Sequence, residues 1–248
     1  MKVNTVCLES DCPNVGSCFS KGLVSFLILG PVCTRSCAFC AVTMGRPSLP
    51  DPAEPFRMAA AARRLNLTRV VITSVTRDDL VDGGAGYFAQ TVHMLKSGGI
   101  KQTEVLVPDF QGKESSLRTL LEAEPDAFAH NVETVPRLYP AVRRGADYLR
   151  SLRLIEKAAE LSRNLPVKSG MMLGIGEAES EVMSVMKDLR LAGCDMLTLG
   201  QYLRPSGRHI PVVEYLGAGK FEEYRLMGVA LGFKQVWSGA LVRSSMAH

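Results

Sequence analysis

The sequence predicts an α/β domain built on a parallel β-sheet, and three observations predict it. Short runs of apolar and β-branched residues alternate with helix-length segments along the whole chain, which is typical of βαβ units. The strand-like runs are almost continuously apolar, as expected for a sheet that is covered on both faces. No glycine- and serine-rich linker or shift in composition divides the chain.

The predicted strands and helices follow each other in chain order. We expect strands at residues 24–29, 69–73, 104–107, 126–130, 167–173 and 195–199, and helices at 53–65, 85–96, 115–124, 150–163, 179–192 and 220–231. Polar or glycine-containing loops follow the strands, and the carboxyl ends of parallel strands meet at one edge of a sheet, so functional residues are expected there. Periodicity alone leaves an open sheet and a barrel as alternatives.

Composition excludes several classes of protein. The 248 residues are 46% hydrophobic and 22% charged, as in ordinary globular domains. The most apolar early run, Leu23–Leu29, is far shorter than the roughly 18 residues of a membrane-spanning helix. The chain reaches Cys7 without a signal peptide, so we expect a cytoplasmic protein. The net charge of +4 is dispersed, which argues against nucleic-acid binding and leaves a mixed-charge surface or one that docks an acidic protein.

Six of the seven cysteines lie within the first forty residues. In a reducing compartment such clustered thiols indicate metal ligands or redox groups. Cys33, Cys37 and Cys40 form a Cys-x3-Cys-x2-Cys pattern directly after the first predicted strand, which we call the barrel triad. Three thiolates in one short loop can hold a four-iron cluster and leave one iron open to a further ligand. A zinc site completed by histidine, or three structural cysteines, is the alternative.

The other three clustered cysteines precede the first predicted strand. Cys7, Cys12 and Cys18 form a Cys-x4-Cys-x5-Cys pattern, which we call the N-terminal triad. It also lacks a fourth cysteine, and beside the barrel triad it indicates a second iron-sulfur cluster. A zinc-stabilised cap is the alternative.

The barrel triad, with the aromatic Phe39 before its last cysteine, resembles the signature of the radical S-adenosylmethionine superfamily. That resemblance implies that S-adenosylmethionine binds the open iron through its amino and carboxylate groups. It also implies that an electron from the cluster cleaves this co-substrate to a 5'-deoxyadenosyl radical. Such a radical removes hydrogen from a saturated carbon, which acid-base side chains cannot do.

The two triads together resemble the lipoyl synthase family, and the resemblance extends over essentially the whole chain. Further matching motifs are Val71–Val75, Arg77–Leu80, Asp82–Gly84, Glu104–Phe110, Lys168–Gly170, Gly200–Leu203, Pro205–Ser206 and Arg243–Ser245. Met246 stands where the family has tyrosine, and the chain begins almost at the N-terminal triad, without the extension that the family usually carries.

The resemblance implies a partial (β/α)6 TIM-type barrel and two 4Fe-4S clusters. We expect an auxiliary-cluster segment at 1–22, the barrel at 23–232, and a C-terminal strand and tail at 233–248 covering that cluster, all in one structural domain. The barrel triad would hold the radical-generating cluster. The N-terminal triad and Ser245 would hold the auxiliary cluster, where an oxygen ligand would release iron more easily than a thiolate. Sequence chemistry does not separate Ser244 from Ser245; the resemblance favours Ser245.

The superfamily resemblance also implies contacts to S-adenosylmethionine. Asn131 and Glu133 alternate along a predicted extended segment, so both side chains could enter one pocket. Gly174 lies in a glycine-rich stretch where a missing side chain would permit close approach of the adenine. The full predicted set is Phe39, Thr73, Ser74, Asn131, Glu133, Lys168 and Gly174.

The implied reaction inserts two sulfur atoms, at C6 and C8 of an octanoyl chain carried on lysine, with the auxiliary cluster as sulfur donor. The implied partners are an octanoylated lipoyl carrier domain, from a 2-oxoacid dehydrogenase E2 or the glycine cleavage H protein, and a flavodoxin or ferredoxin-type electron donor. The alternatives are another radical enzyme, such as a biotin-synthase-like or methylthio-transferring protein, and a zinc-stabilised binding module.

Other polar residues are interpreted as structural. We expect His130 to be a hydrogen-bonded structural histidine and Cys194 a small buried hydrophobic residue. The acidic and basic residues of the segment 77–82 are expected to hydrogen-bond within the loop and to cap the following helix.

Overall fold

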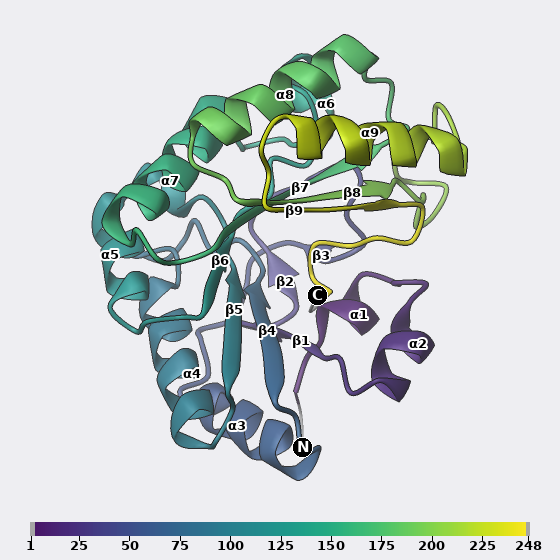
Figure 1. The fold of residues 1–248 in the computed structure, drawn as a ribbon. Coiled ribbons are helices and arrows are strands. Elements are labelled where there is room, and N and C mark those ends of the chain that lie inside the picture. Colours follow the sequence, from purple (N-terminus) through teal and green to yellow (C-terminus); the bar gives the residue numbers. More distant parts are fainter. Residues whose placement is uncertain (1–2, 247–248) are drawn as a thin grey trace. The chain divides into compact units, whose positions relative to one another are not determined.

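The structure is a computed structural model and describes residues 3–246, which form an alternating series of strands and helices (Figure 1). In chain order the elements are α1 Val6–Glu9, α2 Val15–Ser20, β1 Ser25–Ile28, β2 Val32–Cys33, β3 Thr43–Met44, α3 Glu54–Arg64, β4 Arg69–Ser74, α4 Ala85–Ser97, β5 Gln102–Leu106, η1 Phe110–Gly112, α5 Glu114–Leu121, β6 Ala127–Ala129, η2 Pro136–Leu138, α6 Tyr139–Val142, α7 Tyr148–Leu161, β7 Val167–Leu173, α8 Glu179–Leu191, β8 Met196–Gln201, α9 Ala218–Ala230 and β9 Gln235–Gly239.

Every strand and helix expected from the periodicity is present, and only the ends differ. The helix expected from residue 150 begins at Tyr148, because the Asp147 carboxylate accepts a hydrogen bond from the Arg150 N–H at 2.6 Å and caps the first turn. The helix expected to reach residue 124 ends at Leu121, and Glu124 has a left-handed φ of 52°. The short elements α1, α2, α6, β2 and β3 carry no periodic signal and were not predicted from the sequence.

The chain divides into two compact units. Of the described residues, 3–35, 42–128 and 245–246 form the first unit, and 36–41 and 129–244 form the second. The main sheet has the strand order β1-β4-β5-β6-β7-β8-β9, and the boundary between the units falls within β6. Every helix within residues 3–246 is too short or too polar to cross a lipid bilayer.

In the first unit β4 pairs in parallel with both β1 and β5, so that Ile72 lies opposite Phe26 and Val105. Helices α3, α4 and α5 pack side by side in chain order along these strands (Figure 1). Ile72, Val105, Phe88 and other apolar side chains at the interface are fully buried. This core holds the carboxyl ends of β1, β4 and β5 in a rigid frame from which the loops of the site extend.

In the second unit β8 pairs in parallel with β7 and β9, and α9 packs against β9. The register places Gly170 of β7 opposite Thr198 of β8. Leu173, Leu197 and Met186 are fully buried between this sheet and its helices. The parallel pairing within each unit confirms the predicted α/β class.

Candidate cluster and cofactor site

Cys33, the first residue of the barrel triad, ends β2 in the first unit. Strand β2 pairs with the equally short β3, and the Gly45 N–H donates to the Cys33 carbonyl at 2.9 Å. The Cys33 Sγ accepts hydrogen bonds from the Arg35 N–H at 3.4 Å and the Thr76 N–H at 3.3 Å. Backbone N–H groups that donate to a cysteine sulfur are typical of iron-sulfur sites.

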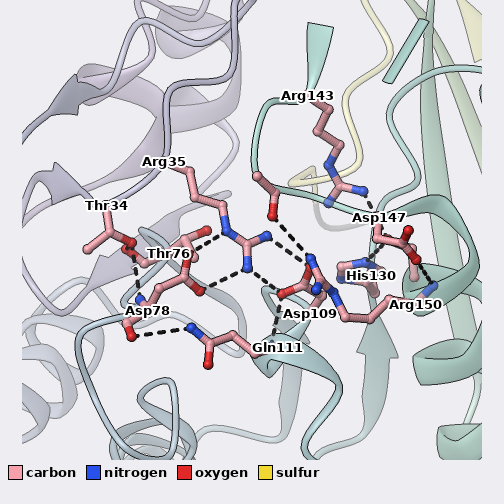
Figure 2. Close-up of polar contacts among 12 residues, drawn as sticks. Thr34, Arg35, Thr76, Asp78, Asp109, Gln111, His130, Arg143, Asp147 and Arg150 are labelled. Atoms are coloured by element: carbon pink, nitrogen blue, oxygen red, sulfur yellow. Dashed lines mark hydrogen bonds and ion pairs between the residues drawn. The ribbon is translucent and has the colours of Figure 1, made fainter. Parts of the chain in front are cut away.

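Arg35 lies between the first two cysteines of the barrel triad and is held by two carboxylates, a feature that the sequence analysis missed (Figure 2). Its guanidinium contacts Asp78 and Asp109 at 2.7 Å each, with the Arg35 side chain 7% exposed. Burial by itself would lower the pKa of Arg35, but the hydrogen bonds that it donates to both carboxylates raise its pKa overall. The sequence signals that could have predicted this contact were an arginine in the cysteine loop and an acidic residue after each of two successive strands.

Cys37 and Cys40 belong to the second unit, together with the rest of their loop. The Cys40 N–H donates to the Cys37 carbonyl at 3.1 Å, which forms a tight turn between the two cysteines. The next contacts anchor this turn: Ala38 N–H donates to the Val142 carbonyl at 2.9 Å, and His209 Nε2 hydrogen-bonds to the Cys40 carbonyl at 3.0 Å. The turn therefore has a fixed place within its unit.

Phe39, between these cysteines, packs against an apolar cluster in the same unit. The buried members of the cluster are Val142, Ile175 and Tyr202. Ile175 belongs to the glycine-rich segment 174–177 after β7, so the aromatic ring predicted to contact the co-substrate packs on a cluster that includes a residue of that segment. Contact with the co-substrate itself stays a prediction.

Asn131 and Glu133 meet in the second unit. The Asn131 Nδ2 donates to Glu133 Oε1 at 3.0 Å and to Ser244 Oγ at 2.5 Å. The expectation of a continuous extended backbone was wrong, because Glu133 has a left-handed φ of 65°. The two side chains still face each other, and the Asn131 Oδ1 is buried without a hydrogen-bond partner among residues 3–246. This pair can therefore offer both an amide oxygen and a carboxylate to a polar ligand.

Arg143 is a half-buried arginine that was not among the predicted site residues. Its Nη1 donates to Tyr139 Oη at 3.0 Å and to Ser151 Oγ at 3.1 Å. Burial opposes its charge, but Tyr139, Glu133 and Cys37 raise the pKa of Arg143 overall. Burial raises the pKa of Glu133, and Arg143 partly offsets that effect.

Lys168 and Gly174 lie at opposite ends of β7. Lys168 is 1% exposed, and its carbonyl accepts from the His130 N–H at 3.0 Å. Gly174 has a φ of 92°, and a Cβ atom there would lie 2.2 Å from the Glu214 carbonyl oxygen. Glycine is therefore required at 174 by the packing of the chain itself. Its predicted role beside the co-substrate stays a prediction.

Thr73 and Ser74 end β4 in the first unit. The Thr73 hydroxyl donates to the Leu106 carbonyl at 2.9 Å, so its side chain already serves the adjacent strand. Ser74 Oγ is buried and has no hydrogen-bond partner among residues 3–246. Of the two, Ser74 has the hydroxyl that is free to bind a ligand.

The N-terminal triad is gathered in the first unit by α1 and α2. Cys7 and Cys18 are buried, and none of the three cysteines forms a disulfide. Burial raises the pKa of the Cys7 thiol, and the neighbouring Cys12 and Cys18 thiols raise it further. Because repulsion between neighbouring thiolates causes part of this pKa shift, the three cysteines lie close enough to interact.

Ser25 joins this triad to the C-terminal tail. Its backbone N–H bonds to the Cys7 sulfur, and its hydroxyl donates to the Ser245 carbonyl. The Asn14 Nδ2 also donates to the Met246 Sδ at 3.7 Å, so the tail has a second contact with the N-terminal segment. Ser244 Oγ is occupied by Asn131, whereas Ser245 Oγ makes no hydrogen bond within residues 3–246.

The donor chemistry fits iron-sulfur clusters. Each triad offers three cysteine sulfurs, the ligands typical of iron-sulfur sites, and Cys33 and Cys7 also receive backbone N–H groups of the kind that tune such clusters. Within residues 3–246 no three His, Cys, Asp or Glu side chains stand close enough to hold a single metal ion as they are arranged. The assignment of individual cluster ligands therefore stays a prediction.

The polar residues expected to be structural are confirmed as such. His130 is fully buried and its Nε2 hydrogen-bonds to Ser151 Oγ at 3.0 Å. Asp82 accepts from the Gly84 and Gly86 N–H groups at 2.9 Å each and caps the start of α4. Arg77 forms a bidentate pair with Asp79, and Cys194 is fully buried.

Comparison with known proteins places the chain. The model of the radical SAM superfamily matches residues 27–189. Lipoyl synthases from Caldanaerobacter subterraneus subsp. tengcongensis and Trichlorobacter lovleyi are 56% and 54% identical to it, over 99% of this chain and 86% and 88% of theirs.

Solved structures show the same fold at low sequence identity. The SuiB protein of Streptococcus suis, bound to its precursor peptide SuiA, has a TM-score of 0.67 at 13% identity, over 91% of this chain and 52% of that one. Methylornithine synthase has a TM-score of 0.60 at 15% identity, over 90% and 74%. The strand order of the sheet and these neighbours agree with the predicted partial barrel. On its motifs, its fold and its full-length identity to curated relatives, the chain belongs to the lipoyl synthase family of radical S-adenosylmethionine enzymes.

Proposed function

We propose that this chain inserts two sulfur atoms into an octanoyl chain carried on the lysine of a lipoyl domain, at C6 and C8, using two 4Fe-4S clusters. The barrel triad holds the cluster that binds S-adenosylmethionine, and the N-terminal triad with Ser245 holds the cluster that donates sulfur. We propose the cytoplasm as its compartment. Its carriers would be the 2-oxoacid dehydrogenase E2 or the glycine cleavage H protein, with a flavodoxin or ferredoxin-type electron donor.

The observation that carries the proposal is the placement of Ser245 beside the N-terminal triad. Ser25 contacts Cys7 with its N–H and the Ser245 carbonyl with its hydroxyl. A residue near the end of the chain thereby joins a thiol cluster near its beginning. A zinc-stabilised cap would have no need of this tail, whereas a cluster with three thiolates has one iron to be ligated.

Bound S-adenosylmethionine and its cluster would supply a radical that removes hydrogen from the saturated chain. The residues of this protein would bind and orient the co-substrate. Asn131 and Glu133 offer an amide and a carboxylate, Phe39 a ring face, and Ser74 a free hydroxyl. The half-buried Arg143 keeps a positive charge beside Glu133 and Cys37. Thr73, Lys168 and Gly174 complete the set of residues proposed to contact the co-substrate.

Mass spectrometry of an octanoyl-lysyl peptide tests the reaction. The protein, reconstituted with iron and sulfide under anaerobic conditions, is incubated with the peptide, S-adenosylmethionine and dithionite. We expect two sulfur atoms added per peptide, together with 5'-deoxyadenosine. Deoxyadenosine with an unchanged peptide would favour another radical enzyme, and bound zinc without sulfide would favour the binding module.

Two adjacent serines provide a matched test of the auxiliary cluster. We expect Ser245→Ala to form deoxyadenosine but no sulfurated peptide, because its cluster loses the oxygen ligand. Ser244→Ala removes only the hydrogen bond to Asn131 and should still yield sulfurated peptide. Cys12→Ala should behave as Ser245→Ala does. Sulfur insertion by Ser245→Ala at the rate of the parent chain would contradict the ligand assignment.

A further inference from the structure

Arg35, Asp78 and Asp109 form an ion-pair cluster that we call the Arg35 clamp. The Arg35 Nε and Nη2 donate to the two oxygens of Asp78 at 2.7 and 2.8 Å. The Nη1 and Nη2 donate to the two oxygens of Asp109 at 2.9 and 2.7 Å. The guanidinium thus makes bidentate pairs with two carboxylates at once (Figure 2), which fixes its orientation as a single salt bridge does not.

The carboxylates of the clamp are themselves held in place by the loops after β4 and β5. Asp109 Oδ1 accepts from the Gln111 N–H at 3.1 Å, and the Gln111 side chain donates to the Asp78 carbonyl at 3.3 Å. Asp109 is fully buried. The clamp therefore ties the cysteine loop to two strand ends through preorganised partners.

The clamp sits beside the backbone that serves the Cys33 sulfur. The Thr34 N–H and hydroxyl both donate to the Thr76 carbonyl, at 3.0 and 2.9 Å, and the Asp78 N–H donates to Thr34 Oγ1 at 3.1 Å. These bonds align residues 34–35 with residues 76–78. In that alignment the N–H groups of Arg35 and Thr76 both point at Cys33 Sγ.

We propose that the Arg35 clamp is a positioning device that holds two N–H donors on the Cys33 sulfur and thereby raises the reduction potential of the cluster bound by the barrel triad. This inference rests on the proposed function, because it takes Cys33 as a cluster ligand. Hydrogen bonds to cluster sulfurs stabilise the additional negative charge of the reduced state. Arg35 acts through its backbone and through its two carboxylate partners, not by touching the co-substrate.

The test is a redox titration followed by electron paramagnetic resonance. It uses the full chain with Cys7, Cys12 and Cys18 replaced by alanine, so that one cluster is measured. Arg35→Lys keeps the positive charge but cannot form two bidentate pairs. We expect the reduction equilibrium constant of the cluster to fall about tenfold in this variant, which lowers the midpoint potential by about 59 mV for one electron.

Arg77→Lys is the matched control. Arg77 is also buried and makes a bidentate pair with Asp79 at 2.8 Å, but neither residue donates to a cysteine sulfur. We expect this variant to lose thermal stability while the midpoint potential of its cluster stays at the parent value. Equal shifts in both variants would mean that loosening the loop is sufficient, and would overturn the inference.

Thr34→Val provides a second measurement if Arg35→Lys does not load its cluster. It removes the hydroxyl that joins Thr76 to Asp78 without changing charge or shape, and we expect a smaller shift in the same direction. If Arg35→Lys binds its cluster and the midpoint potential equals that of the parent chain, the inference is overturned and the proposed function stays intact. If Arg35→Lys binds no cluster, the same result in Thr34→Val overturns the inference. A parent chain that takes up no iron and sulfide overturns both.

Discussion

The role of a single residue in this chain depends more on its surroundings than on its residue type. Seven cysteines share one chemistry, yet Cys194 is fully buried in a core, whereas burial and the neighbouring thiols raise the pKa of Cys7 and Cys18. Two serines lie next to each other at the end of the chain, and only one has a free hydroxyl within the described residues. Burial and neighbouring charge decide which group can bind iron.

The burial of Cys194 predicts its reactivity. Burial raises the pKa of its thiol to about 12, and its Sγ donates to the Met196 carbonyl at 3.2 Å. At pH 9 only about one thousandth of this thiol would be ionised, compared with about three quarters of an ordinary cysteine. We expect iodoacetamide to leave Cys194 unmodified in the folded, iron-free protein up to pH 9 and to modify it in urea, as read by peptide mass spectrometry.

Cys12 is the internal control for that experiment, because it is partly exposed. It should be alkylated in the folded iron-free chain under the same conditions. Alkylation of Cys194 at the rate of Cys12 would show that the segment between α8 and β8 opens readily, and would contradict the buried assignment.

At the scale of elements, the strand β8 provides the surface on which the C-terminal tail lies. A Cβ at Gly200 would stand 2.2 Å from the Val242 carbonyl oxygen, and a Cβ at Gly170 would stand 3.0 Å from Ser244 Cβ. Both glycines leave room for the tail that follows β9. Their small size therefore supports the hydrogen bond between Ser244 and Asn131.

Gly200→Ala should displace the tail. The added methyl group cannot coexist with the Val242 carbonyl, so the tail must shift, and we expect a loss of about 1–3 kcal/mol in the free energy of unfolding. Trypsin cleavage after Arg243 should become faster, and urea denaturation measures the stability. Gly207→Ala is the control, because nothing lies within 4 Å of its added Cβ. Equal effects of the two substitutions would refute the packing argument.

At the scale of the whole molecule, the termini are the parts whose order depends most on the proposed clusters. The N-terminal triad lies in two short helices, α1 of 4 residues and α2 of 6 residues, which are too short to be stable alone. The tail residue Ser245 is tied to Ser25 beside Cys7. A ligand that binds only the folded arrangement stabilises it by mass action.

Loading iron and sulfide should therefore protect both ends of the chain. We expect slower amide hydrogen exchange in residues 3–25 and 240–246 after reconstitution, and a return to the original rates when a chelator removes the iron. At free ligand one hundred times the dissociation constant, the gain would be about 2.7 kcal/mol. Cys12→Ala should abolish the protection at these ends, and protection that persists in this variant would contradict a cluster at the N-terminal triad.

The sequence by itself determined the elements and the family. Apolar periodicity within ten or so residues predicted the strands of the main sheet from β1 to β8 and the helices between them, whereas β9 was expected only from the family resemblance. Cysteine spacing within single loops identified the two triads, because that signal is also local. Helix ends such as Tyr148 and the left-handed backbone of Glu133 were not predicted, since caps and turns there depend on particular contacts.

Only the tertiary structure decided which distant residues meet. Arg35 contacts Asp109 across 74 positions of the sequence, Asn131 contacts Ser244 across 113, and Ser25 contacts Ser245 across 220. Such pairs follow from how strands register and where their loops emerge, which no local pattern encodes. The proposed positioning of Cys33 and the proposed ligand role of Ser245 both draw on these contacts.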